Sequence, residues 1–331
     1  MQRFLTTATT EQLSHDMPAR CLLCGAADSI SLSLIAASEL ARMYQRYLGF
    51  SPTVELSDIK DFDYRHCRAC DLRFFWPPRT GSEDFYATLQ KQSWYHLADK
   101  PEYRIAHRYI PRSCKLLEIG CGSAAFASTL AAVDYTGLEF SPDAIRAAAR
   151  NGHTILQTSI QEHAAEYPER YDIVCAFQVL EHVSQVNSFI AASVQVLKPG
   201  GKLIYCVPSP ESYLAHMRNS VLNMPPHHVT HWTDRALESI GRLFDIELLA
   251  LQHERLAEMH RIDYAACLLS NSVNSLLGRK HRILDNSVIE LMLGKVSYRL
   301  RKLLARGIDD TMSPHGHTVL AVFRKPRVNV H

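Results

Sequence analysis

The sequence predicts an α/β fold in which a largely parallel β-sheet is covered by helices on both faces, with a small cysteine-paired module in front of it. From Lys115 onward, short apolar segments alternate with amphipathic stretches, which is typical of successive β-α-β units in a buried sheet. Before that point, the chain carries two widely separated Cys-x-x-Cys pairs. The predicted strands are residues 115–120, 135–140, 153–158, 171–177 and 202–208, followed by closing strands at 244–251 and 318–323.

The composition is that of an ordinary globular protein. The chain has 331 residues, 47% of them hydrophobic and 21% charged, and a formal net charge of +2. So small a charge gives no general affinity for polyanions, and nucleic acid is therefore not the expected partner. No apolar run reaches the roughly 20 residues that a transmembrane helix needs, and the polar stretch 1–20 lacks the apolar centre of a signal peptide. We therefore expect a cytoplasmic protein without a transmembrane segment.

Three regions are expected along the chain. Residues 1–80 are expected to form the cysteine module, with a helix at 38–48 inserted between the two cysteine pairs. Residues 81–110 are expected to form a helical linker, and residues 111–331 the α/β domain. Within that domain we expect a helical insertion at about 254–306. The insertion closes with a basic stretch made of Lys295, Arg299, Arg301, Lys302 and Arg306.

The nine cysteines divide into two close pairs and five single residues. The pairs are Cys21 with Cys24 and Cys67 with Cys70. Together they supply the four thiolates that tetrahedral zinc prefers, and a complete shell of four leaves no open position for a reacting water. The sequence thus predicts a structural zinc in a small zinc ribbon, with independent core cysteines as the alternative. The single cysteines are expected in the apolar core: Cys114, Cys121, Cys175, Cys206 and Cys267.

A glycine turn follows the first predicted strand of the α/β domain. The chain runs from an apolar strand through Gly120 and Gly122 into a helix expected from Ala125. Such a turn lets the backbone approach a ligand at the carboxyl edge of a parallel sheet. Glu139 ends the next strand, at about the distance where an acid meets ribose hydroxyls in dinucleotide-binding folds. The dinucleotide pattern would place a third glycine near position 125, where this chain has alanine.

The turn resembles motif I of the class I methyltransferases, whose usual form is E-x-G-x-G and which reads EIGCG at residues 118–122 here. The resemblance extends through residues 172–183, which are similar to the fourth-strand motif of that family, and through the turn at 197–201. It implies a Rossmann-like class I methyltransferase sheet that binds S-adenosylmethionine. By the same resemblance, the methionine part would be flanked by Glu118, Gly120 and Gly122, the ribose by Glu139, the adenine by Ser159 and Ile160, and the sulfonium end by Gln178.

A segment rich in proline and histidine follows the fifth strand. Residues 223–234 combine two prolines that restrict the backbone with three histidines that can exchange protons near neutral pH. Methyl transfer to a hydroxyl needs alignment and a base. The candidate bases are His227, His228, His231 and, after the fourth strand, His182. We choose His228, because Trp232 beside it could stack its ring on a sugar. The alternative is that these histidines make structural hydrogen bonds, and that Glu181 favours the dipole of a following helix.

A second resemblance covers most of residues 20–235. The order of ribbon, Trp76-Pro77-Pro78 break, Trp94-Tyr95 linker, methyltransferase core and Pro-Pro-His-His segment resembles a bacterial family of zinc-ribbon methyltransferases associated with polysaccharide and sugar-nucleotide pathways. This resemblance implies a small-molecule or glycan acceptor, with transfer to a hydroxyl of a sugar, nucleotide sugar or glycan. Similar sugar C-methyltransferases usually carry a further C-terminal domain for which this chain is too short, which favours O-methylation.

Two other functions fit parts of the sequence. An RNA methyltransferase would use the ribbon and the basic stretch to hold phosphates, with binding that weakens steeply as salt rises. The ribbon carries few interleaved basic and aromatic residues, which argues against this function. A non-catalytic interaction protein would keep the fold and bind the cofactor without turnover. The intact Gly120, Gly122 and Glu139 favour a working cofactor site over that alternative.

Overall fold

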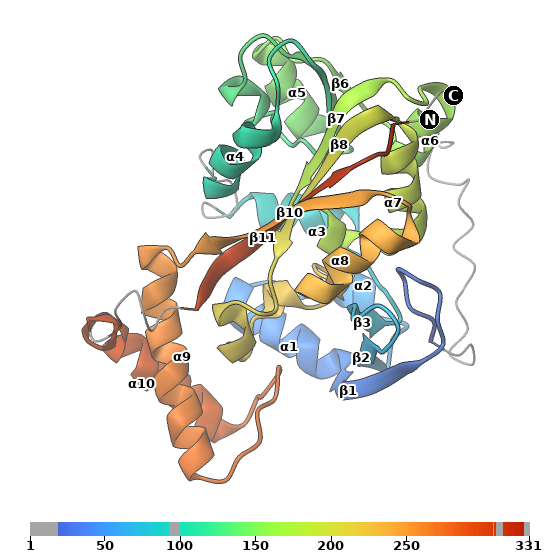
Figure 1. Ribbon diagram of the computed structural model, residues 1–331. Coiled ribbons are helices and arrows are strands. Elements are labelled where there is room, and N and C mark those ends of the chain that lie inside the picture. Colours follow the sequence, from blue (N-terminus) through green and yellow to red (C-terminus); the bar gives the residue numbers. More distant parts are fainter. Residues whose placement is uncertain (1–18, 93–99, 307, 309–313, 328–331) are drawn as a thin grey trace.

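Two β-sheets organise the protein (Figure 1). The computed structural model describes residues 19–92, 100–306, 308 and 314–327. The predicted Trp94-Tyr95 linker and part of the expected cysteine module, residues 1–18, lie outside the described residues. The larger sheet has seven strands and the smaller sheet has four. The predicted α/β class is therefore confirmed, with a second sheet that the sequence did not reveal.

The seven-stranded sheet is parallel except at one strand. Its members are β4 Lys115–Ile119, β5 Asp134–Leu138, β6 Ile155–Leu156, β7 Tyr171–Phe177, β8 Leu197–Pro208, β10 Glu247–Arg255 and β11 His315–Arg324. Their order is β10-β11-β8-β7-β4-β5-β6, and β11 is antiparallel to both of its neighbours. All seven predicted strands are thus present. The strand order reverses between β4 and β7, which is where open α/β sheets bind their ligands.

Helices cover both faces of this sheet. They are α4 Pro101–Ala106, α5 Pro142–Arg150, α6 Ile160–Glu166, α7 Val186–Gln195 and α8 Asp234–Leu243. On β4, Leu117 and Ile119 belong to the core that α6, α7 and α8 cover, whereas Leu116 packs with α4 on the other face. Burial on both faces is typical of a parallel strand. Ser141 caps α5 and Ser159 forms a capping box on α6, so short polar side chains fix where both helices begin.

Two local predictions are wrong. The helix expected from Ala125 is a single 3-10 turn, η2 Ala127–Thr129, because the connection 120–133 is too short for a glycine turn, a full helix and a return to the sheet. Residues 197–201, expected as a turn, belong to β8, which pairs with β7 across a register shift at its start. The other 3-10 turns are η1 His107–Tyr109, η3 Leu180–His182, η4 Tyr213–His216 and η5 Val221–Asn223.

The four-stranded sheet joins the N-terminal region to a distant part of the chain. The elements are β1 Ser29–Ala36, α1 Ala37–Leu48, α2 Thr53–Leu56, β2 Asp61–Cys67, β3 Arg73–Trp76, α3 Glu83–Gln90 and β9 Thr230–His231. The strands are antiparallel in the order β1-β2-β3-β9, and α1 is the helix expected between the cysteine pairs. In the last pair, Phe74 lies opposite Thr230. The sheet therefore spans the boundary expected at residue 80, while the division into domains stays a prediction.

Two long helices connect β10 to β11 in the sequence. They are α9 Glu258–Leu276 and α10 Val288–Ala305, and they form an arm that projects from the rest of the protein (Figure 1). At the base of the arm, Tyr264 of α9 packs with Tyr213 and Leu256. In the part of the chain that the structure describes, no helix is long and apolar enough to span a membrane.

Candidate active site

The glycine turn after β4 has a conformation that requires glycine. Gly120 and Gly122 have φ angles of 67° and 53°, in the left-handed region that other residues rarely adopt. A Cβ atom on Gly120 would lie 2.6 Å from Cγ2 of Val179, so a larger residue does not fit. A Cβ atom on Gly122 would meet no heavy atom of the described residues within 4 Å. The turn is therefore packed on one side and open above Gly122, as a loop that receives a ligand must be.

Glu139 connects the glycine turn to the start of α5. Its Oε2 atom accepts a hydrogen bond from the N–H of Gly122 at 2.8 Å. Its Oε1 atom accepts from the N–H groups of Phe140 and Ser141 at 2.8 and 2.9 Å. Three backbone donors thus hold the carboxylate at the carboxyl edge of the sheet. Because a carboxylate has further lone pairs, it can accept ribose hydroxyls as well, although this role of Glu139 stays a prediction.

Glu118 lies on β4 with its side chain buried below the glycine turn. The hydroxyl of Tyr135 donates a 2.6 Å hydrogen bond to its Oε2 atom. Burial raises the pKa of Glu118 to about 8, and the Tyr135 hydroxyl and the positive charge of Lys100 oppose that rise. A carboxyl group that titrates near neutral pH is a common mark of a functional site. The sequence motif identified Glu118 but not Tyr135 or Lys100, because both lie outside it.

The other predicted cofactor residues lie along the same edge. Ser159 caps α6 by accepting a hydrogen bond from the N–H of Glu162 at 3.1 Å, and Ile160 next to it is buried. Gln178 follows β7 with a φ angle of 57°, and its side-chain amide donates a 3.4 Å hydrogen bond to the hydroxyl of Thr318. The hydroxyl of Ser159 thus already accepts a hydrogen bond from its own helix. Gln178 directly precedes Val179, the residue that packs against Gly120. Their roles toward a cofactor stay predictions.

Three of the predicted histidines form a tight cluster. One ring nitrogen of each of His182, His227 and His228 lies within 4.8 Å of the others. The Nδ1 atom of His182 lies 2.6 Å from the carbonyl oxygen of His227. The Nδ1 atom of His227 lies 2.7 Å from the carbonyl oxygen of Leu222, and that of His228 lies 3.0 Å from Oδ1 of Asn223. These oxygens favour protonation at Nδ1, which leaves the lone pairs on Nε2.

Glu181 lies against two of these rings. Its Oε1 atom is 3.8 Å from Nε2 of His182 and 3.9 Å from Nε2 of His228. The side chain is 1% exposed, and within the described residues neither carboxylate oxygen has a hydrogen-bond partner. Burial raises the pKa of Glu181 to about 8. An uncompensated buried carboxyl group is costly for stability, so its presence beside two histidines points to a functional role.

Burial lowers the pKa of all three clustered histidines. The pKa of His182 falls to about 4, and those of His227 and His228 lie well below the usual 6.5. Repulsion between the rings contributes to the lowering at His227 and His228. The rings are therefore neutral at physiological pH, which is the form that can accept a proton. Burial keeps Glu181 largely protonated near neutral pH, and a ring that becomes protonated beside it would favour ionisation of this carboxyl group.

Trp232 and His231 occupy structural positions. Trp232 is 0% exposed, and its indole N–H donates a 3.0 Å hydrogen bond to the hydroxyl of Thr230. The prediction that its ring stacks on a sugar is therefore wrong, because the chain at β9 enters the main apolar core instead of lining a surface. The ring nitrogens of His231 lie 2.7 Å from the hydroxyl of Tyr64 and 2.8 Å from the carbonyl oxygen of Asn223. With both nitrogens engaged, His231 fits the structural alternative.

The segment after β7 joins the glycine turn to the histidines. Val179 contacts Gly120, and two residues later Glu181 faces the cluster. The carbonyl oxygen of Glu181 accepts a 2.8 Å hydrogen bond from the N–H of Val229, which follows the clustered histidines and precedes β9. The two halves of the candidate site thus share one edge of the sheet.

Other segments bring further polar residues to the site. The hydroxyl of Tyr86 in α3 lies 3.2 Å from Nδ1 of His182. Burial raises the pKa of Glu102 in α4, and it raises the pKa of Glu254 in β10 to about 7. Sequence reasoning missed all three, because their spacing forms no local motif. The only sequence signal for these residues is a polar residue among apolar neighbours. That pattern is common on any exposed helix, so it does not identify a site.

The four paired cysteines also meet in space. Their sulfur atoms lie within 4.8 Å of one another, with 3.4 Å between those of Cys21 and Cys70 and 3.6 Å between those of Cys24 and Cys67. These distances are far longer than the roughly 2.05 Å of a disulfide bond. They are close to the separation of about 3.8 Å between thiolates at tetrahedral angles with Zn–S bonds of about 2.3 Å. The donor set therefore fits zinc.

The fold and the glycine turn define a doubly wound α/β protein, a class whose ligand sites lie where the strand order reverses. A family model described as "Methyltransferase domain" matches residues 85–251, about half of the chain. The chain belongs to this methyltransferase domain family. The class inferred from the glycine turn and from the segment 172–183 is thereby confirmed.

The chain is also similar to ubiquinone biosynthesis O-methyltransferases over a limited stretch. It is 32% identical over 99 residues to the enzyme of Proteus mirabilis, which corresponds to 28% of this chain and 40% of the relative. The relative from Photorhabdus laumondii shows the same identity over 99 residues, 28% of this chain and 41% of its own. The chain thus spans about two fifths of the length of these curated relatives. The structure of a SAM-dependent methyltransferase from Archaeoglobus fulgidus aligns with 72% of this chain and with 100% of its own length. The TM-score of this alignment is 0.47 and the sequence identity is 16%.

Proposed function

We propose that the protein transfers a methyl group from S-adenosylmethionine to a hydroxyl of a small-molecule acceptor. The observation that carries this proposal is the contact of Val179 with Gly120, which places the glycine turn next to Glu181 and the histidines. A methyl donor on the turn would therefore lie beside groups that can take up a proton. Membership in the methyltransferase domain family supports the reaction, and the names of the O-methyltransferase relatives support an oxygen acceptor.

The residues around the glycine turn fit the proposed cofactor. When bound, S-adenosylmethionine supplies a methyl carbon that its sulfonium activates. The open space above Gly122 admits a ligand close to the backbone, and Glu139 offers carboxylate oxygens to ribose hydroxyls. Glu118 and Gly120 flank the same turn on the side of the methionine part. We place Ser159 and Ile160 nearest the adenine and Gln178 nearest the sulfonium, because they follow β6 and β7 at this edge.

For the proton of the acceptor hydroxyl, we infer that His228 is the base. Asn223 engages its Nδ1 atom, so Nε2 carries the lone pair, and Glu181 lies 3.9 Å from that nitrogen. The protein then needs only to align the hydroxyl with the methyl carbon while the imidazole removes the proton. His182 and His227 are the alternative bases in the same cluster.

As acceptor, we propose a sugar, nucleotide sugar or glycan. The polar groups of Tyr86, Glu102, Gln178 and Glu254 suit a molecule with several hydroxyls, because each can exchange hydrogen bonds with a hydroxyl group. The resemblance to zinc-ribbon methyltransferases of polysaccharide and sugar-nucleotide pathways points to the same class.

We further propose a structural zinc on Cys21, Cys24, Cys67 and Cys70. The sulfur distances support it, and four thiolates complete the tetrahedral shell that structural zinc prefers. Thiolates that bind zinc must stay reduced, which supports a cytoplasmic place of action.

The test is transfer of a labelled methyl group to a panel of nucleotide sugars, glycolipids, polyprenylated phenols and RNA, with the product identified by mass. We expect label on a sugar hydroxyl. Glu139→Ala should give the same product but weaken cofactor binding roughly 10- to 100-fold, because it removes hydrogen bonds to a charged group. Labelled RNA would favour the RNA methyltransferase, and label on a phenol alone would replace the sugar as the acceptor. Absence of S-adenosylmethionine binding in calorimetry would contradict the proposed function itself.

A further inference from the structure

Helix α10 carries an apolar stripe that the described residues leave uncovered. The stripe consists of Ile289, Met292, Val296, Leu300 and Leu303, all of which are exposed. Their spacing of three or four residues places them in a single line along the helix. The side chains of Met292 and Leu303 are 63% and 64% exposed, although residues of these types usually lie in a protein core. An amphipathic helix normally turns its apolar stripe toward the protein, so this outward stripe calls for another surface.

A basic stripe adjoins the apolar stripe. Its members are Lys295, Arg299, Lys302 and Arg306, which are exposed and belong to the basic stretch noted in the sequence. Lys295 and Arg299 lie three residues after Met292 and Val296, respectively, which places the two stripes side by side. The one acidic residue of α10 is Glu290, and it is buried. The exposed surface of this helix therefore combines apolar side chains with positive charge.

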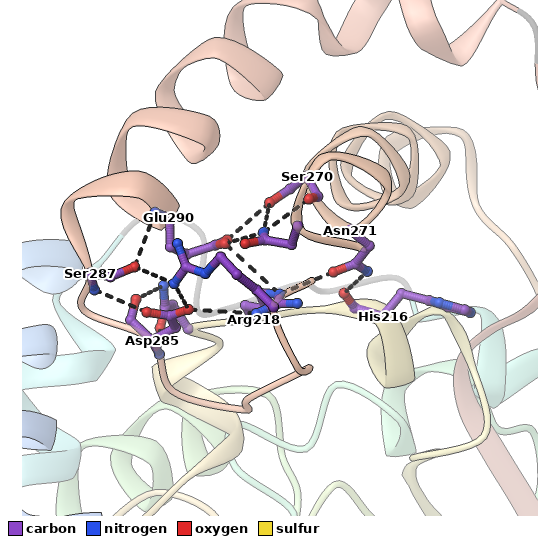
Figure 2. A network of polar contacts seen from close by, with 10 residues as sticks. His216, Arg218, Ser270, Asn271, Asp285, Ser287 and Glu290 are labelled. Atoms are coloured by element: carbon purple, nitrogen blue, oxygen red, sulfur yellow. Dashed lines mark hydrogen bonds and ion pairs between the residues drawn. The ribbon is translucent and has the colours of Figure 1, made fainter. Parts of the chain in front are cut away.

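A buried polar network holds the opposite side of α10 against the protein (Figure 2). Glu290 accepts hydrogen bonds from the hydroxyl of Ser270 at 3.0 Å and from the amide of Asn274 at 2.7 Å, both on α9. The guanidinium of Arg218 lies 3.6 Å from Asp285 and 3.9 Å from Glu290. Breaking a buried charge pair is strongly unfavourable, so the network fixes which side of α10 faces inward. Both exposed stripes are consequently presented outward by a firmly attached arm.

We propose that α10 binds the surface of a membrane that contains anionic lipids. An interfacial helix inserts an apolar face at the headgroup boundary while basic side chains contact anionic headgroups, and α10 offers both features next to each other. A second copy of the chain would bring two basic stripes together, and nucleic acid would leave the apolar stripe in water. A membrane surface satisfies both stripes at once. This inference does not depend on the proposed methyl transfer.

The test is sedimentation of the full chain with vesicles of phosphatidylcholine alone or mixed with phosphatidylglycerol. We expect binding to the anionic vesicles that weakens as salt rises. The double variant Lys295→Gln, Arg299→Gln should bind about 25-fold more weakly, because each basic residue near the surface contributes about a factor of five. The double variant Met292→Glu, Val296→Glu should lose binding. Matched controls are Arg150→Gln on α5 and Val54→Glu on α2, both exposed positions that should leave binding unchanged.

Circular dichroism and thermal melting should show that all variants keep the fold, because every substituted side chain is exposed. Equal binding to neutral vesicles, no binding to either, or unchanged binding of both double variants would overturn the proposal. A dimer that Met292→Glu, Val296→Glu converts to a monomer, without vesicle binding, would identify a second copy as the occupant instead. RNA binding that depends on Lys295 and Arg299 but not on Met292 and Val296 would likewise replace the membrane.

Discussion

The cofactor half and the acceptor half of the candidate site are built in different ways. In the cofactor half, the glycine turn and Glu139 come from consecutive β-α units and are joined by short backbone hydrogen bonds. In the acceptor half, His182 follows β7, Tyr86 comes from α3, and His228 lies next to a strand that completes the N-terminal sheet. The first half depends on local backbone geometry, whereas the second depends on the packing of the whole chain. Substitutions should therefore separate binding from turnover.

Removal of the proposed zinc should have the largest effect and should strike the acceptor half. Cys67 ends β2 and Cys70 lies three residues before β3, which pairs with β9 beside the histidines. Because a structural zinc contributes on the order of 10 kcal/mol to folding, chelation or Cys67→Ser should abolish turnover, while affinity for S-adenosylmethionine should change little. Metal analysis, calorimetry and the methyl-transfer assay measure the three quantities. Cys267→Ser, outside the cluster, should keep metal and activity. A metal-free protein with full turnover would show that the acceptor half does not depend on the proposed zinc.

The next effect concerns the proposed base. His228→Ala should lower turnover by about 100- to 10,000-fold, the usual contribution of general-base catalysis, without weakening cofactor binding. His228→Asn should be equally impaired, because it keeps a hydrogen-bonding group but not a base. His281→Ala, an exposed histidine, is the matched control. Turnover should be measured against pH for all three variants. Near-full activity of His228→Asn would move the base to His182 or His227.

A pH series tests the buried carboxyl group of the acceptor half. The pKa of Glu181 is raised from its usual 4.5 to about 8, so ionisation opposes folding, and the stability of the wild type should fall relative to Glu181→Gln as pH rises from about 4.5 to about 8. The difference should reach a few kcal/mol, since one pKa unit corresponds to about 1.4 kcal/mol. Urea unfolding across this range gives both free energies of unfolding. A difference that does not vary with pH would mean that Glu181 titrates normally.

The smallest effect is expected in the cofactor half. Gly120→Val should weaken S-adenosylmethionine binding about 5- to 100-fold, because the strained φ angle and the contact with Val179 together cost about 1 to 3 kcal/mol and displace the turn. Gly152→Val provides the control, since Gly152 also has a positive φ angle but an added Cβ atom would meet none of the described residues within 4 Å. Calorimetry measures the affinity of both variants and of the wild type for S-adenosylmethionine. If Gly120→Val binds like the wild type, the cofactor lies elsewhere.

The same contrast explains what the sequence could predict. The strands of the large sheet and the glycine turn were predictable because their apolar runs and glycines are local signals. The prediction for Trp232 is wrong because a tryptophan beside histidines is also typical of a binding site, whereas the burial of this ring follows from the pairing of β9 with a distant strand. The sequence suggests for Glu181 only the alternative of a helix-dipole residue, because His228, one of the two rings that it faces, comes from another segment. The short length of the connection 120–133, rather than its composition, limits η2 to a single turn.

The pairing of Phe74 with Thr230 also has a consequence during protein synthesis. It joins positions 156 residues apart (230 − 74 = 156), so β3 leaves the ribosome long before its partner β9. At typical translation rates of about 5 to 20 residues per second, the edge of β3 stays open for roughly 8 to 30 s. That edge carries Phe74 and Phe75, which are fully buried in the finished protein. An open apolar strand edge favours pairing between chains, so the nascent chain should depend most on a chaperone during this interval.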